Sequence, residues 1–303
     1  MRGLKSKQGI RIDTSGRVLK IISYATVIFF AVMSVVPFIF LISGSFTAEG
    51  YIMKHGYGLL PHEPTISAYK LLFQNPDTII GSYIVTMFIT AVGTGVGLII
   101  TAMTGYVLQR PDFAYRNIIA FFIYFTSLFS GGIVAYYITI VKWLGLKNNY
   151  LAIILPMMVT SWNVILMKNF MKEIPHEVSE SAMVDGASNI RIFFRIILPM
   201  SGPALATVGL FLALSYWNEW YNSMLFLDNN VEYRPLQLFL YNVVNKADFI
   251  RRAGENAGID TSNIPMETTK LAVAVVATGP VILFYPFVQR YFIKGITIGA
   301  VKG

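Results

Sequence analysis

The sequence predicts an all-α membrane protein with six transmembrane helices. Hydrophobic residues make up 55% of the 303 residues and charged residues only 13%, whereas about 25% of a soluble domain is charged. The apolar residues gather in long runs, and a helix needs about 20 of them to cross a bilayer. We expect spans at about 21–42, 79–108, 117–141, 150–167, 201–227 and 269–288.

The first apolar run, 21–42, follows a polar and basic segment, residues 1–20. A signal peptide has the same order, but this run is too long for its apolar part and shows no clear small-residue cleavage site. We therefore interpret residues 1–20 as a cytoplasmic N-terminal segment and residues 21–303 as a transmembrane domain.

Two long polar segments, at about 45–77 and 228–267, are expected to lie outside the membrane on the outer side. Glycine and proline recur in the first segment, which predicts a loop with one short helix near 66–73. The second span contains Gly93 and Gly97, and small residues at this spacing let helices pack closely.

A polar helical segment at about 171–199 separates the fourth and fifth spans. Pro175 suits the start of a helix, Gly186 the left-handed end of one, and Ser188 the cap of a second helix. The pattern predicts two short helices joined by a glycine turn, with small and acidic side chains in the first half. An ordinary amphipathic connection between spans is the alternative. The second helix carries an apolar stripe expected to lie on an apolar surface: Ile190, Phe193, Phe194, Ile197 and Leu198.

The placement of basic residues predicts the orientation of the chain. Most of the 24 lysines and arginines fall on the segments that share a side with the N-terminus, and basic loops stay in the cytoplasm. Both termini and the 171–199 segment are therefore expected inside. This topology accounts for the net charge of +8, so nucleic-acid binding is not expected.

Catalytic, cofactor and metal sites are not expected in this chain. It contains no cysteine and no G-x-x-x-x-G-K-[ST] phosphate loop, so ATP would have to be hydrolysed by another protein. His176-Glu177 lacks the second histidine of a zinc-binding helix. Buried ionisable residues mark ion-coupled transporters. The predicted spans are nearly free of them, with Glu219 as the main exception, which weakens that alternative.

A stretch of aromatic and polar residues near the end of the fifth span is a candidate substrate pathway. Aromatic rings stack on sugar faces, and amides and acids bind hydroxyl groups, so this mixture suits a wet cavity that passes sugars. An interfacial belt of Trp and Tyr is the alternative. The residues concerned are Tyr216, Trp217, Asn218, Glu219 and Trp220.

The 171–199 segment resembles the cytoplasmic EAA loop of permease subunits of ABC importers. The resemblance lies in Glu180-Ser181-Ala182, Asp185-Gly186-Ala187, the Phe193-Phe194 pair and Leu198-Pro199, with Ser181 in place of the usual alanine. It implies a cytoplasmic coupling-helix loop that docks into a cleft of an ATPase subunit. The coupling residues would be Glu180, Ser181, Ala182, Asp185, Gly186 and Ala187.

The chain is similar in particular to the carbohydrate-uptake branch of these permeases. The resemblance lies in the Gly145-Leu146-Lys147-Asn148 turn, Trp217-Asn218 and the tail from Lys294. It is similar to the second permease subunit of maltose-type importers, and it looks closer still to permeases for complex oligosaccharides such as those from pectin or alginate.

This resemblance implies a multi-pass subunit of the bacterial cytoplasmic (inner) membrane that is not itself an enzyme. The expected partners are a homologous permease that completes a heterodimeric pore, two ATPase subunits that hold ATP and Mg, an extracytoplasmic solute-binding protein and an oligosaccharide substrate. The C-terminal tail is expected to contact the ATPase pair. A permease for another solute and an ion-coupled secondary transporter remain alternatives.

Overall fold

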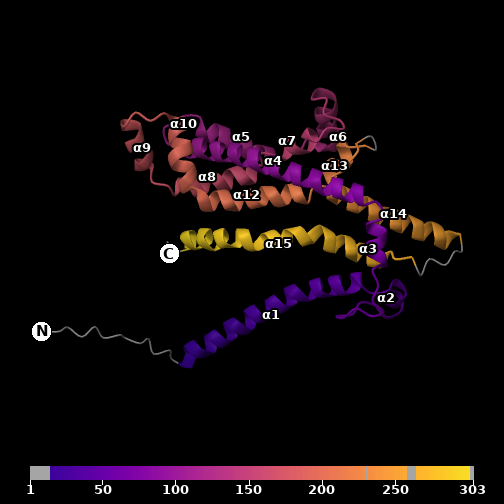
Figure 1. Ribbon diagram of the computed structural model, residues 1–303. Coiled ribbons are helices and arrows are strands. Elements are labelled where there is room, and N and C mark those ends of the chain that lie inside the picture. Colours follow the sequence, from indigo (N-terminus) through magenta and orange to yellow (C-terminus); the bar gives the residue numbers. More distant parts are fainter. Residues whose placement is uncertain (1–13, 229–230, 258–263, 301–303) are drawn as a thin grey trace. The chain divides into compact units, whose positions relative to one another are not determined.

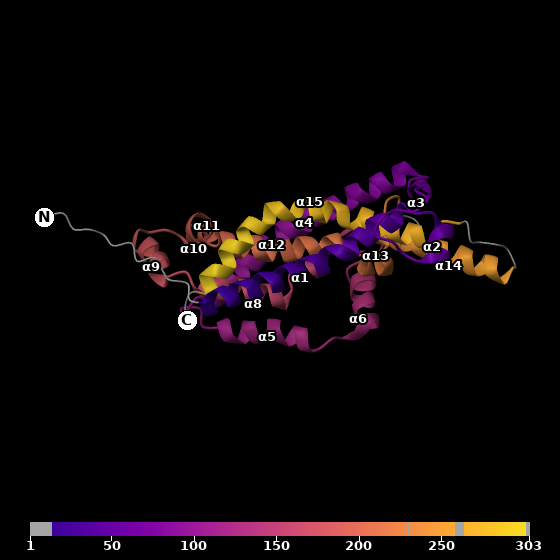
Figure 2. The ribbon, with the colours of Figure 1, turned by 90° about the horizontal axis from the view of Figure 1, so that it is seen from below.

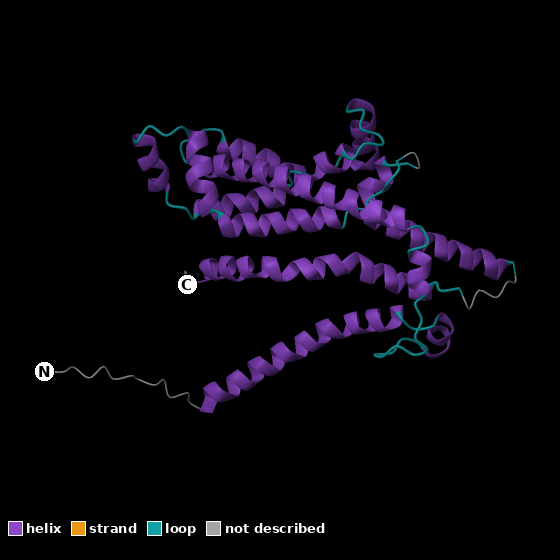
Figure 3. Ribbon diagram, viewed as in Figure 1, coloured by secondary structure: helices purple, strands orange, loops and turns teal. Residues whose placement is uncertain are grey.

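The computed structural model describes residues 14–228, 231–257 and 264–300, with only the backbone for residues 14–16, 255, 284, 285 and 287–300. All regular secondary structure in these residues is helical (Figure 3), which confirms the all-α class. The chain divides into two compact units, Met1–Leu72 with Arg251–Val275, and Phe73–Ile250 with Val276–Gly303. Each unit is described by itself. Most of the predicted N-terminal segment 1–20 lies outside the described residues.

The first unit is organised around a buried carboxylate. It contains α1 (Thr14–Ser45), α2 (Glu49–His55), α3 (Ser67–Leu72), the end of α14 (Leu236–Asn256) and the start of α15 (Glu267–Ala300). Glu49 is only 6% exposed. Its two oxygens accept hydrogen bonds from the backbone N–H of Glu267 at 2.8 Å and from the N–H and hydroxyl of Thr268 at 2.9 and 2.8 Å. Glu49 therefore caps the N-terminus of α15, where unpaired N–H groups favour a negative charge.

The second unit is built around the 34-residue helix α4 (Pro76–Gln109). Figures 1 and 2 show α8 and α12 lying along it, and these two helices make its most extensive contacts. The unit also takes in α14 up to Ile250 and α15 from Val276. The other elements that lie wholly within it, in chain order, are α5 (Arg116–Leu128), α6 (Gly132–Ile138), η1 (Thr139–Trp143), α7 (Leu151–Met157), α8 (Ser161–Lys172), α9 (His176–Val184), α10 (Asn189–Ile192), η2 (Phe193–Ile197), α11 (Leu198–Met200), α12 (Gly202–Trp217) and α13 (Tyr221–Phe226).

Two glycines allow α4 to approach its neighbours closely. A Cβ atom on Gly97 would lie 2.7 Å from the carbonyl oxygen of Met158, and one on Gly93 would lie 2.4 Å from the ring of Tyr216. Between them, a Cβ atom on Gly95 would meet nothing within 4 Å. The predicted close packing at the Gly93-x-x-x-Gly97 spacing is therefore confirmed.

The membrane spans are less regular than the sequence predicts. Within the described residues, two helices are long and apolar enough to cross a bilayer alone, Arg17–Ser45 and Pro76–Gln109. Three further spans require a bent pair of helices, with bends of 116° after Leu128, 46° after Met157 and 84° after Met200. The predicted sixth span, 269–288, lies inside α15. Six spans remain a prediction.

The polar segments hold more helix than the sequence suggests. The expected short helix near 66–73 is present as α3, but α2 was not predicted. The segment 228–267, predicted as a loop, contains the 21-residue helix α14. The sequence of α14 is polar on average, because asparagines and basic residues alternate with the apolar residues that pack on the protein. The prediction of a loop followed from this average. In the predicted fifth span, 201–227, the long helix α12 ends at Trp217.

The close approach of α4 gives a test with a matched control. We expect Gly97→Leu to destabilise the protein by roughly 1–3 kcal/mol, because a larger side chain would push α4 away from Met158. Thermal unfolding of the detergent-purified chain measures the loss. Gly95→Leu, on the open side of the same helix, should unfold at the wild-type temperature, and equal effects of both changes would contradict this packing.

Candidate functional site

The glycine turn predicted for the 171–199 segment is present in detail. At the end of α9 the N–H of Ala187 donates to the carbonyl of Ala182 at 2.9 Å. The N–H of Gly186 donates to the carbonyl of Met183 at 3.0 Å. This pair of bonds is a Schellman motif, which needs the left-handed φ of 79° seen at Gly186. The hydroxyl of Ser188 then accepts the N–H of Arg191 at 3.4 Å and caps α10.

The second helix of the segment buries a different face from the predicted one. Phe193 and Ile197 are buried, but Ile190 is 70% and Phe194 45% exposed, and Ile192 is fully buried instead. The cause is the π-helical turn η2, which places residues five apart on one face. The prediction assumed the spacing of a regular α-helix and therefore assigned the wrong side chains to the buried face.

Two alanines of the loop, one in α9 and one just after it, face the protein's own core. Ala182, Met183 and Ala187 pack against a buried cluster built from α4, α8, α10, η2 and α12. Ala182 and Ala187 are therefore only partly available at the surface, and their role in docking stays a prediction. The exposed surface, which we call the outer face of the loop, consists of Glu180, Ser181, Val184, Asp185 and Gly186.

The outer face of the loop contains a large apolar side chain that the sequence analysis missed. Val184 is 88% exposed and lies one turn after Glu180, so the two share a face. The Glu180 side chain is 64% exposed and lies 3.1 Å from Nδ1 of His176. The outer face of the loop therefore presents an exposed apolar side chain next to an acid.

The end of α4 is tied to the loop through Arg110. Its guanidinium donates to Oδ1 of Asn189, the first residue of α10, at 2.7 Å and to Oδ1 of Asp112 at 2.8 Å. It also lies 5.7 Å from the ring centre of Tyr106. The hydrogen bond from Arg110 is the main reason that the pKa of Asp112 is held below its usual value. A displacement of α10 would therefore be passed to α4.

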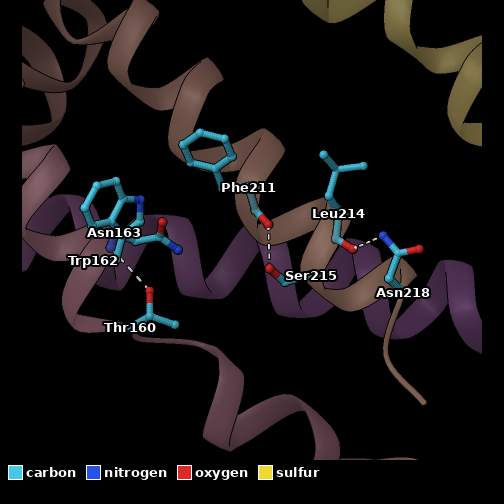
Figure 4. A pocket seen from close by; sticks show the side chains of 7 residues that line it. All are labelled: Thr160, Trp162, Asn163, Phe211, Leu214, Ser215 and Asn218. Atoms are coloured by element: carbon cyan, nitrogen blue, oxygen red, sulfur yellow. Dashed lines mark hydrogen bonds between the residues drawn. The ribbon is translucent and has the colours of Figure 1, made fainter. Parts of the chain in front are cut away.

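A pocket of about 480 Å³ opens between the start of α8 and the second half of α12. Figure 4 shows residues of α8 and its cap on one side and residues of α12 on the other. The lining combines two aromatic rings, two hydroxyls and two amides, with no charged side chain. The lining residues are Thr160, Trp162, Asn163, Phe211, Leu214, Ser215 and Asn218.

Of the five predicted pathway residues, only Asn218 lines this pocket. Tyr216 is 2% exposed, and its hydroxyl donates to the carbonyl of Ile154 at 2.7 Å. Trp217 is 7% exposed and donates from Nε1 to the carbonyl of Ala277 at 3.1 Å. The prediction that Tyr216 and Trp217 line a wet cavity is wrong, because both lie on the buried face of α12.

Glu219 and Trp220 have structural contacts of their own. The carboxylate of Glu219 accepts the N–H groups of Asn222 and Ser223, at 2.5 and 3.3 Å, and so caps α13. It is only 9% exposed, so the expected wet surroundings are not found. Trp220 is 39% exposed and stacks on Tyr241 with ring centres 4.9 Å apart. Among the residues with described side chains, no three histidines or acids gather to hold a metal ion.

Residues 14–298 match the family described as "Binding-protein-dependent transport system inner membrane component". The chain belongs to this family. It is 38% identical, over 95% of its length and 99% of the relative's, to the polygalacturonan/rhamnogalacturonan transport system permease protein YtcP of Bacillus subtilis (strain 168). It is 27% identical, over 97% and 100% of the two chains, to the trehalose/maltose transport system permease protein MalG of Thermococcus litoralis.

A solved structure supports the same assignment. The permease resembles a chain in the crystal structure of a bacterial ABC transporter involved in the import of the acidic polysaccharide alginate. The TM-score is 0.76 at 30% identity, and the match covers 92% of this chain and 98% of the other. The predicted resemblance to sugar-importer permeases is thereby confirmed.

The capping role of Glu219 in this permease can be separated from a role in transport. We expect Glu219→Ala to lower stability by about 0.5–2 kcal/mol, because α13 loses the acceptor for its first N–H groups. Glu219→Gln keeps an oxygen at that position and should lose less. Thermal unfolding of the purified chain measures both changes, with the exposed Asn218→Ala as control. Glu219→Ala with wild-type stability would show that the cap contributes nothing.

Proposed function

We propose that the chain is the transmembrane permease subunit of an ATP-driven importer for oligosaccharides and forms half of its pore. The observation that carries the proposal is the similarity over nearly the whole chain to permeases named for plant polysaccharides and for trehalose and maltose. Membership of a binding-protein-dependent family favours ATP-driven import over the ion-coupled alternative. The similarity to sugar permeases favours a sugar over another solute.

The outer face of the loop is the proposed contact with an ATPase subunit. Glu180, Asp185 and Val184 offer two charges and one apolar group for docking, and Gly186 has open space around it. The inner face of α9 rests on the core shared by α4, α8 and α12. A push on the loop when the ATPase pair closes would therefore move these helices together, with Arg110 fixing α10 to α4. ATP and Mg would be held in the partner.

The pocket beside Asn218 is the proposed station for sugar inside this subunit. Trp162 and Phe211 offer ring faces, while Asn218, Ser215 and Thr160 offer amide and hydroxyl groups for hydrogen bonds with sugar hydroxyls. The lining carries no charge. Sugar would pass without covalent change, so the chain acts as a translocation subunit and not as an enzyme.

The proposed assembly has both termini and the 171–199 loop in the cytoplasm of a bacterium, with six crossings of the inner membrane. A homologous permease would complete the pore, two ATPase subunits would bind inside, and a solute-binding protein would deliver sugar to the outer segments 45–77 and 228–267. Support for this arrangement comes from the family description, which names an inner membrane component that depends on a binding protein.

The docking role of the outer face is tested by reversing a charge. We expect Asp185→Lys to lower sugar-stimulated ATPase activity of the reconstituted transporter by about tenfold or more, because a complementary charge across an interface becomes repulsive. Glu173→Lys makes the same charge change at an exposed site before α9 and should have little effect. Full coupling in Asp185→Lys would remove the docking proposal.

The sugar pocket is tested by removing a ring. We expect Trp162→Ala to reduce uptake of radiolabelled oligosaccharide several-fold, because stacking contributes roughly 0.5–1.5 kcal/mol, while assembly with the ATPase persists. Trp143→Ala removes an indole of similar exposure outside the pocket, since Trp143 is 79% and Trp162 68% exposed. Equal uptake by both variants would show that the pocket holds no substrate.

A further inference from the structure

The helix that follows the glycine turn runs across the spans instead of along them. Residues Asn189–Met200, which comprise α10, η2 and α11 and which we call the transverse helix, are bent by 84° from α12. Figure 1 shows α10 lying across the end of α4, with α9 further out. The predicted fifth span, 201–227, begins only after this bend. The transverse helix therefore runs close to the plane of the membrane.

The level of the transverse helix along the spans is fixed by its first residue. The side chain of Asn189 accepts a hydrogen bond at 2.7 Å from Arg110, the residue that follows the end of α4. Charged side chains begin at this level, with Arg110 and Asp112 after α4 and Lys172 at the end of α8. Because charged groups avoid the hydrocarbon of a bilayer, the transverse helix lies at the boundary between membrane and water.

The exposed surface of the transverse helix consists of two rows of side chains. Ile190 is 70% and Phe194 45% exposed, and these two residues are four positions apart. Arg191 and Arg195 are also exposed and are spaced in the same way. Residues four positions apart are neighbours on a helix surface. An apolar row therefore lies beside a basic row, and the remaining side of the helix is buried on the core.

The two rows are held in place but lack partners suited to them. The ring of Phe194 contacts the edge of the buried Phe193 ring, with centres 4.9 Å apart, so its position is supported from below. In the described part of the chain the guanidinium groups of Arg191 and Arg195 form no ion pair. Residues 188–200 contain no acid that could neutralise them.

This combination of position and chemistry fits a lipid surface. Helices that lie in the plane of a membrane interface place Phe and Leu side chains among the upper acyl chains and Lys and Arg among the headgroups. Each basic residue near an anionic lipid surface strengthens binding by about fivefold. A lipid leaflet offers both environments side by side, at the level where the transverse helix lies.

We propose that the transverse helix binds the anionic phospholipid headgroups of the leaflet on the side of the loop. Ile190 and Phe194 contact the upper acyl chains, and Arg191 and Arg195 bind the phosphates. The lipid surface thereby fixes the level of the loop, while the outer face on α9 remains free for a protein. This role goes beyond the proposed function, because it requires neither a sugar nor an ATPase.

The test is the surroundings of a spin label on the full chain in nanodiscs. The chain has no cysteine, so a label on Ile190→Cys is unique. Collisions of the label with oxygen, which concentrates in lipid, are compared with collisions with a water-soluble nickel chelate. We expect oxygen to dominate at Ile190→Cys. Val184→Cys is the matched control, because Val184 is 88% exposed on α9, where the nickel chelate should dominate.

The charge of the lipid is tested by replacing phosphatidylcholine with phosphatidylglycerol. We expect the ratio of oxygen to nickel collisions at Ile190→Cys to rise several-fold. The added double change Arg191→Gln and Arg195→Gln should remove most of this rise, because both arginines act on the headgroups. Lys54→Gln with Arg252→Gln removes the same charge from two exposed sites in the predicted outer segments and should preserve the rise.

Three results would overturn the proposal. The first is a label at Ile190→Cys that the nickel chelate reaches more readily than oxygen in phosphatidylglycerol. The second is an equal response to phosphatidylglycerol in the two double variants. The third is a label closed to both reagents, in the chain alone or in the reconstituted transporter, since a protein would then cover this face. Sugar uptake and ATPase activity are not measured, so each of these results leaves the proposed function standing.

Discussion

The structure depends on how closely α4 approaches the helices around it. At Gly97 the backbone of α4 comes so near the carbonyl of Met158 that no side chain fits between them, and at Gly93 the ring of Tyr216 fills the gap. Close approach of this kind increases van der Waals contact, which is the main attraction between helices in a membrane, where lipid removes the hydrophobic driving force. The bent pair α7 and α8 and the helix α12 are thereby held as one body with α4.

This body links features that lie far apart along α4. At one end, the buried cluster of Tyr106, Met167, Phe193 and their neighbours supports the inner face of the loop. At the other, Thr86 and Gly81 anchor the chain that enters α14. Because packed protein interiors have low compressibility and transmit strain, a force on the loop would be carried along α4. One of the three bends, the one after Met157, adjoins the pocket beside Asn218.

Local physics made part of this structure predictable from the sequence. The glycine turn at Gly186 and the cap at Ser188 depend on residues within one helical turn, and both occur where expected. The membrane class and the family followed from composition and from the EAA-like spacing.

What the sequence could not show is which side of an element meets the rest of the protein. Ala182 and Ala187 suit a docking surface by size, but both are partly buried against the cluster behind them. Tyr216 and Trp217 have the chemistry of a sugar pathway, yet carbonyl groups of other helices satisfy their polar atoms. The π-turn η2 changes the buried face through one extra residue in the turn, and the helix α14 is hidden by its polar average.

The carboxylate of Glu49 has a consequence for the order in which the chain folds. Its hydrogen-bond partners are N–H groups that lie 218 and 219 residues further along the chain. Contacts of such high sequence separation close large loops and form late. Until the ribosome has made the start of α15, the acid is left without these partners, and its burial costs free energy. A segment made 218 residues later thus completes the surroundings of Glu49, and the first unit can close only after that segment has left the ribosome.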